Sequence, residues 1–175
     1  MSLLEKQTEE HIWIYTIDMM SISSIEESDR DWDWYASDPD AMVGHFTTAG
    51  IRGLPRTVRQ DREAAFRLIH YFDVEAPKSA AYVVRPEVEM DVGGWKDAKA
   101  RSWYLSSFED MASKGLFSYD TFLSGPDEYH LVAFAQVPLH ISELPPDIRE
   151  LVKRTKSPHR FAKFPYLSGA DTLNW

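Results

Sequence analysis

The sequence contains no cysteine, which excludes disulfide bonds, thiolate nucleophiles and cysteine-ligated zinc or iron–sulfur sites. It also lacks any run of roughly 18 apolar residues that could span a bilayer. Its first ten residues hold no cationic segment of the kind that opens a secretory signal. We therefore expect a cytoplasmic protein that does not insert into membranes.

Basic residues are scarce relative to acidic ones. The chain has 19 Lys and Arg against 28 Asp and Glu, a formal net charge of -9, which argues against direct binding to nucleic acid. The imbalance is uneven, because residues 26–40 hold seven carboxylates and one Arg, whereas residues 149–163 hold six basic residues and one Glu. These segments could pair within one chain or between the copies of a homo-oligomer.

The signatures of common enzyme and cofactor classes are also missing. The sequence has no GxSxG, GxxxxGK[ST], GxGxxG or HExxH, and no two of its six histidines stand four residues apart. An EF-hand loop starting at Asp29 would need Gly sixth and Glu twelfth, where the chain has Trp34 and Asp40. We therefore predict no catalytic residue set, no metal site and no cofactor.

What the sequence does contain is sufficient for one folded domain. With 175 residues, 43% hydrophobic and 13% aromatic, it can bury about two-thirds of its unfolded surface in a single core. No repeat, low-complexity tract or linker divides the chain, so we predict one domain over residues 1–175. Residues 156–175 are basic, aromatic and without periodicity, and we expect them to form an irregular tail. We expect the basic stretch from Lys153 to Lys163 to be solvated.

Hydrophobic periodicity and turn chemistry predict an α+β fold. Strands are indicated at residues 11–17 (alternatively the end of a helix starting near Leu4), 32–37, 42–48, 80–84, 116–122 and 128–137. The turn Asp38-Pro39-Asp40-Ala41 would join two of them as a hairpin, and residues 21–31 are predicted to be a loop. Apolar spacing indicates helices at 57–72 and 95–113 and a short one after Pro145. We expect a mixed or largely antiparallel sheet with the two long helices packed on one face and a short C-terminal helix.

The aspartate-rich hairpin is the most distinctive segment. On a strand, Asp31 and Asp33 would share one face while Trp32 and Trp34 share the other. The simplest interpretation is a half-exposed strand whose aromatic face packs in the core. The functional alternative is a carboxylate row beside aromatic anchors that binds a basic surface of a partner protein. The predicted partner-binding residues are Asp29, Asp31, Asp33, Trp34, Asp38 and Asp40.

A second candidate site surrounds His45. This residue precedes Ala49-Gly-Ile-Arg-Gly-Leu-Pro55, where the two glycines predict a loop. A pocket of His45, Thr47 and Arg52 would let His45 act as the general base of an enzyme of unfamiliar type. Single histidines in strands are more often satisfied structural residues, so the enzyme stands as the alternative to a binding protein. A structural or oligomeric subunit is the third alternative.

Several short phrases carry a resemblance to other proteins. They are Asp31-Trp-Asp-Trp-Tyr-Ala-Ser-Asp38, Val43-Gly-His-Phe-Thr-Thr-Ala-Gly50, Leu54-Pro55, Ala112-Ser-Lys-Gly-Leu-Phe-Ser-Tyr-Asp120 and Tyr129-His-Leu-Val132. In these phrases the chain resembles a loosely defined group of uncharacterised bacterial proteins, some of which occur near polymorphic toxin systems as immunity proteins. The resemblance implies binding without chemistry. Together with the carboxylate row, it leads us to expect a protein partner with a basic surface, which could be a toxin.

Overall fold

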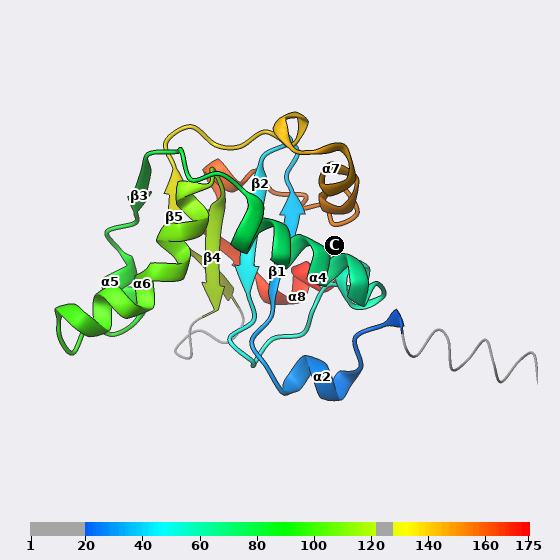
Figure 1. The fold of residues 1–175 in the computed structure, drawn as a ribbon. Coiled ribbons are helices and arrows are strands. Elements are labelled where there is room, and N and C mark those ends of the chain that lie inside the picture. The colour runs from blue at the N-terminus through cyan, green and yellow to red at the C-terminus, as the bar shows by residue number, and fades with distance from the viewer. Residues whose placement is uncertain (1–19, 122–127) are drawn as a thin grey trace, which may run out of the picture.

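A computed structural model of the chain describes residues 20–121 and 128–175, and a six-stranded sheet lies at its centre (Figure 1). The strands are β1 (Asp33–Ser37), β2 (Val43–Thr47), β3 (Tyr82–Val84), β4 (Phe117–Thr121), β5 (Glu128–Ala135) and β6 (Tyr166–Ser168). Their order is β1-β2-β4-β5-β3, and β6 also pairs with β5. Strands β2 and β4 run parallel, while the other pairings are antiparallel. The predicted α+β class with a mixed sheet is confirmed.

Some predicted elements cannot be compared with the structure, and others differ from it. The strand expected at residues 11–17 lies outside the described residues. The loop expected at residues 21–31 contains a short helix, α2 (Ser24–Ser28). Ser23 and Glu26 form a reciprocal capping box at its start, which is a helix signal that the sequence analysis overlooked.

The predicted hairpin is formed by β1 and β2. In its turn the Asp38 N–H donates to the Met42 carbonyl and the Ala41 N–H donates to the Asp38 carbonyl, and Ala41 takes up a φ of 60°. One Asp38 carboxylate oxygen accepts the N–H groups of Asp40 and Met42, both at 2.9 Å. An aspartate in this position satisfies the amides of its own turn, so Asp38 stabilises the hairpin from inside.

Helices cover one face of the sheet, which is the near face in Figure 1. They are α4 (Arg62–His70), extended by the π-helical segment η1 (Tyr71–Glu75), then α6 (Ala98–Ser113) and α7 (Pro146–Val152). The shorter helices are α3 (Arg56–Arg59), α5 (Val88–Asp91), α8 (Gly169–Thr172), η2 (Ile141–Glu143) and η3 (Phe161–Lys163). The helix expected at 57–72 is interrupted because the Asp61 carboxylate accepts the Ala64 N–H and caps a new helix there.

The C-terminal segment covers the opposite face of the sheet, so the expectation of a solvated, irregular tail is wrong. Phe161, Leu167 and Trp175 are buried in one cluster with Trp34 and Phe46. Phe46 stacks on Trp34 with ring centroids 4.1 Å apart, and Trp175 meets both rings edge-on. The helices therefore pack on one face of the sheet and the tail on the other. Without the tail, this aromatic face would be exposed to solvent.

Candidate functional site

The helix-covered face changes from apolar to polar along β1, β2 and β4. At one end Val43 and Leu116 lie in an apolar cluster with residues of α4, η1 and α7. Side chains on one face of a strand recur every two residues, so the same face continues along each strand with polar groups. These are Asp33 and then Asp31 on the β1 side, His45 and Thr47 on β2, and Ser118 and Asp120 on β4.

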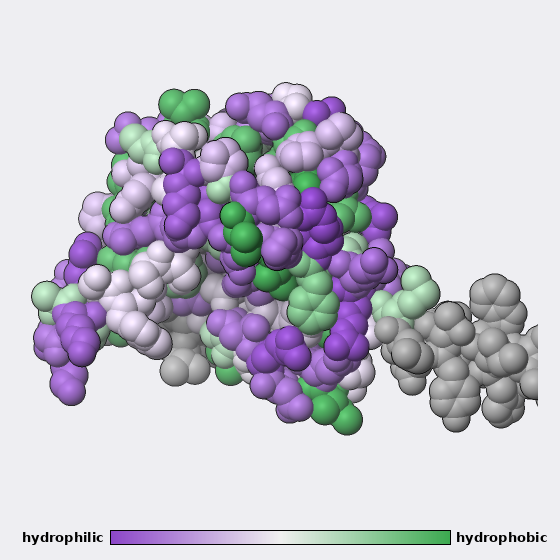
Figure 2. All heavy atoms as spheres, in the orientation of Figure 1, coloured by the Kyte–Doolittle hydropathy of each residue, from purple (hydrophilic) through white to green (hydrophobic). Residues whose placement is uncertain are grey.

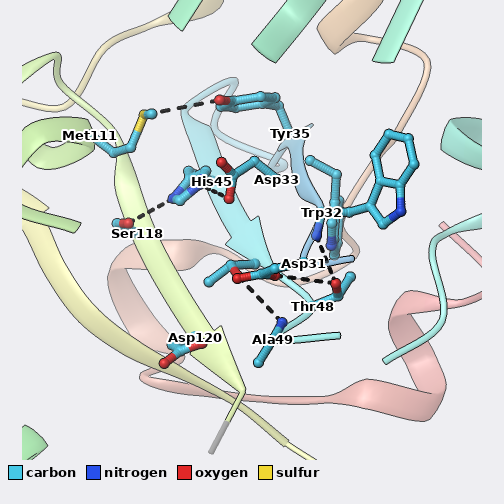
Figure 3. A network of polar contacts seen from close by, with 12 residues as sticks. Asp31, Trp32, Asp33, Tyr35, His45, Thr48, Ala49, Met111, Ser118 and Asp120 are labelled. Atoms are coloured by element: carbon cyan, nitrogen blue, oxygen red, sulfur yellow. Dashed lines mark hydrogen bonds and ion pairs between the residues drawn. The ribbon is translucent and has the colours of Figure 1, made fainter. Parts of the chain in front are cut away.

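His45 lies at the centre of this polar region and is only 1% exposed. The parallel register places it opposite Ser118, and its ring contacts a strand on either side (Figure 3). Its Nδ1 lies 2.8 Å from the Ser118 hydroxyl, and its Nε2 lies 3.1 Å from a carboxylate oxygen of Asp33. Both ring nitrogens are thus satisfied, although the ring is almost wholly desolvated.

Two further aspartates, Asp31 and Asp120, lie beyond His45 toward the polar end of the helix-covered face (Figure 3). Asp31 accepts hydrogen bonds from the hydroxyls of Thr47, at 2.6 Å, and Thr48, at 3.3 Å. Asp120 accepts one from the Tyr104 hydroxyl at 2.6 Å and one from the Thr121 N–H at 2.7 Å. Burial nevertheless raises the pKa of the Asp120 carboxyl to about 6, since the two bonds only partly offset the loss of hydration.

These groups line a cleft of about 390 Å³ between the sheet and α6. Its described lining contains no Lys or Arg and consists of Asp31, Asp33, His45, Thr47, Ala49, Trp103, Tyr104, Ser106, Ser107, Phe108 and Asp120. Trp103 is 81% exposed, which is unusual for the largest apolar side chain. Hydrophilic residues dominate the face of the molecule shown in Figure 2, with hydrophobic groups scattered among them. The result is an open, acidic cleft with an aromatic ring at its edge.

The structure divides the six predicted partner-binding residues among different places. Asp31 and Asp33 line the cleft, and Asp29 is exposed at the end of α2. Asp40 is exposed at the opposite end of the hairpin, where it pairs with Arg160 at 2.9 Å. The predicted acidic row is therefore not one continuous surface.

Two of the predicted partner-binding residues are buried, so their place in a binding surface is corrected. Trp34 is 1% exposed and donates its indole N–H to the Tyr129 hydroxyl at 3.3 Å. Asp38 is also buried, and besides the turn amides it accepts the N–H of Phe161 from the tail. Both residues hold the core together, because the tail covers the face that the sequence alone left open.

The predicted pocket is brought together in part. His45 and Thr47 line the cleft, but Arg52 does not. Arg52 extends toward the tail-covered face, where its Nε donates to the Thr121 hydroxyl at 3.0 Å. Three residues of the cleft, Trp103, Tyr104 and Asp120, were not predicted from the sequence. The alternation of Ser118 and Asp120 on a predicted strand was the available signal, but nothing in the sequence places β4 beside β2.

Comparisons with protein-family models, with curated proteins and with solved structures found no match for this chain. Within residues 20–121 and 128–175, no helix has both the length and the hydrophobicity needed to cross a bilayer. In the same part of the chain, no three His, Asp or Glu side chains are grouped so that they could hold a metal ion. What the fold and geometry define is an α+β domain with an acidic cleft.

Proposed function

We propose that this protein is a non-enzymatic, cytoplasmic protein-binding module whose acidic cleft receives basic side chains of a partner protein. The observation that carries the proposal is the convergence of Asp31, Asp33 and Asp120 on one cleft. Among the described residues, no Lys or Arg forms an ion pair with any of the three. Their hydrogen bonds come from hydroxyls, one backbone N–H and one imidazole, so their charges remain for a ligand.

Acidic residues elsewhere in the molecule are treated differently. Many have cationic neighbours, such as Asp40 with Arg160 and Asp61 with Arg154, at 2.9 and 2.6 Å. Asp110 likewise binds the buried Lys114 ammonium at 2.6 Å. The contrast supports a binding role for the cleft, because its three aspartates have no Lys or Arg partner among the described residues, whereas Asp40, Asp61 and Asp110 are each paired with one.

Trp103 supports the proposal from the edge of the cleft. A Lys or Arg side chain entering beside the aspartates can place its charge over the face of the indole ring. Exposed Trp residues are also frequent anchors in interfaces, since they bury a large area with few rotatable bonds. The cleft therefore combines electrostatic attraction with an aromatic anchor.

We take the partner to be a toxin with a basic surface, in line with the resemblance to immunity proteins. A toxin that acts on nucleic acid needs clustered Lys and Arg to meet phosphates. An acidic cleft can occupy such side chains and so compete with the nucleic acid. Complementary charge would speed association and favour the correct partner more than it would raise affinity.

The proposal can be tested with a labelled hexa-arginine peptide as the probe, followed by fluorescence anisotropy at physiological salt. An Asp31→Asn/Asp33→Asn variant should bind the peptide about tenfold more weakly, because two cation–carboxylate contacts are lost. The matched control, Glu63→Gln/Glu89→Gln, makes the same change in net charge at exposed positions outside the cleft. It should bind like the wild type. Equal weakening by both variants would show diffuse attraction and would contradict a cleft site.

One observation favours an enzyme as the second candidate. A carboxyl group with a pKa of about 6 shares the cleft with other carboxylates, and such pairs serve as proton donor and acceptor in acid–base catalysis. Ser118 cannot be a nucleophile toward a ligand in the cleft, because it is fully buried behind His45. Turnover of aryl esters or aryl glycosides by the wild type, lost in Asp120→Asn, would establish this candidate in place of binding.

A further inference from the structure

Resting on the proposed function, we propose that Ser118 and His45 are positioning residues, which hold the Asp33 carboxylate in place for a cationic side chain in the cleft. They form a chain of hydrogen bonds across three neighbouring strands, from β4 through β2 to β1. Solvent exposure increases along this series of hydrogen bonds. Ser118 is fully buried, His45 is 1% exposed and the Asp33 side chain is 35% exposed. These hydrogen bonds thus connect the core to the wall of the cleft.

The positions of the protons on the imidazole determine how His45 can bond to Ser118 and Asp33. When the Ser118 hydroxyl donates to Nδ1, the neutral ring carries its proton on Nε2 and donates it to Asp33. When the ring is cationic, both nitrogens donate and the bond to Asp33 is kept. In either form one Asp33 oxygen accepts from His45, and the other oxygen is left to face the ligand. An aspartate held in this way loses less conformational entropy when it binds a cation.

The position of His45 is one that the fold could fill with an apolar side chain. Val43, two residues earlier on the same face of β2, is fully buried in an apolar cluster. Tyr35 and Phe108 also lie beside the His45 ring, with centroids 5.4 and 6.5 Å away. A purely structural residue here would avoid the desolvation of an imidazole and a hydroxyl. The polar chain is therefore best explained by what it does to Asp33.

The test compares His45→Gln, His45→Leu and Ser118→Ala with the wild type. The Gln side chain keeps an N–H donor near the position of Nε2, whereas Leu of similar size keeps none. NMR scalar couplings that report the Asp33 χ1 angle give a readout without any ligand. Hexa-arginine affinity gives the second readout, and urea unfolding shows which variants are folded.

We expect one Asp33 rotamer in the wild type and in His45→Gln, with peptide affinities within about twofold of each other. His45→Leu should average the rotamers and bind the peptide about fivefold more weakly, and Ser118→Ala should fall between them. If His45→Leu does not fold, the other two variants still decide the matter. Thr172→Val, which removes one buried hydroxyl bond outside the cleft, is the control and should leave both readouts unchanged.

Two results would overturn the positioning role. One is a single Asp33 rotamer in His45→Leu with the affinity of the wild type, and the other is an averaged rotamer in His45→Gln. Failure of the proposed function has a different signature, because the wild type would then not bind the peptide at all. In that case the couplings alone would still show whether His45 holds Asp33.

Discussion

At the residue scale, Asp120 shows how burial and charge compete in the cleft. Its carboxyl is mostly withdrawn from water, and burial raises its pKa from 3.8 to about 6. The folded protein therefore binds this proton more tightly than the unfolded chain does. The sign follows from linkage: Asp120 favours folding below pH 4, and this contribution is lost as the pH rises through 6. At neutral pH the ionised group opposes folding.

Replacement of Asp120 by Asn should accordingly stabilise the protein at pH 8. A pKa difference of about two units corresponds to roughly 3 kcal/mol, and we expect about 1–3 kcal/mol because Asn reproduces the hydrogen bonds imperfectly. Near pH 4 the advantage should vanish, since the wild-type carboxyl is then protonated. Urea unfolding at both pH values measures the effect. A variant that is less stable than the wild type at pH 8 would contradict this account of the site.

At the element scale, the C-terminal segment is the feature that most changes the view of the molecule. It contributes η3, β6 and α8, and it covers the aromatic face that carries Trp34 and Phe46. Gly44 marks the closeness of this packing, because a Cβ there would come within 2.7 Å of the Phe161 ring. The contact of Arg160 with Asp40 also joins the basic segment to the acidic hairpin within one chain.

Truncation of Phe161 should therefore be costly. Phe161→Ala removes a buried ring from the core and should lower the free energy of unfolding by about 3–5 kcal/mol. Phe164, three residues later and 41% exposed, provides the control, and its Ala variant should lose less than about 1 kcal/mol. Chemical denaturation of both variants gives the comparison. Equal losses at the two positions would mean that the tail does not cover the core as described.

The elements that the sequence predicted are those specified by local signals. The hairpin follows from alternation and from the turn at Asp38, and α6 follows from its apolar spacing and from Gly115 at φ 95° just after its end. The tail has no period, so only its aromatic residues hinted that it packs. The parallel pairing of β2 with β4 joins residues such as His45 and Ser118, which are 73 positions apart, and no local pattern records it.

The same difference between local signals and tertiary contacts explains which residues of the candidate site could be predicted. Asp31, Asp33, His45 and Thr47 were found because they follow one another in a single hairpin. Trp103, Tyr104 and Asp120 were missed because α6 and β4 reach the cleft only through the tertiary fold. An inward-facing Trp34 was one of the two interpretations of the hairpin, whereas no local signal indicated that Asp38 would accept the Phe161 N–H of the tail.

At the scale of the whole molecule, the acidic residues differ in whether a Lys or Arg lies beside them. The basic segment meets Asp40 and Asp61 through Arg160 and Arg154, and no Lys or Arg is among the described residues that line the cleft. A net charge of -9 would attract basic proteins from any direction, whereas the cleft offers them one place to bind. We therefore expect a basic partner to bind in the cleft and not over the whole acidic surface.

The most direct way to locate the binding site is an NMR titration of the full chain with the hexa-arginine peptide. Amide spectra report every residue, and the Trp103 indole N–H reports the edge of the cleft. We expect saturable shifts that are concentrated at residues 31–33, at residues 45–49, at Trp103 and at Asp120. Small shifts spread over all acidic surfaces, with Trp103 unmoved, would contradict a binding site in the cleft.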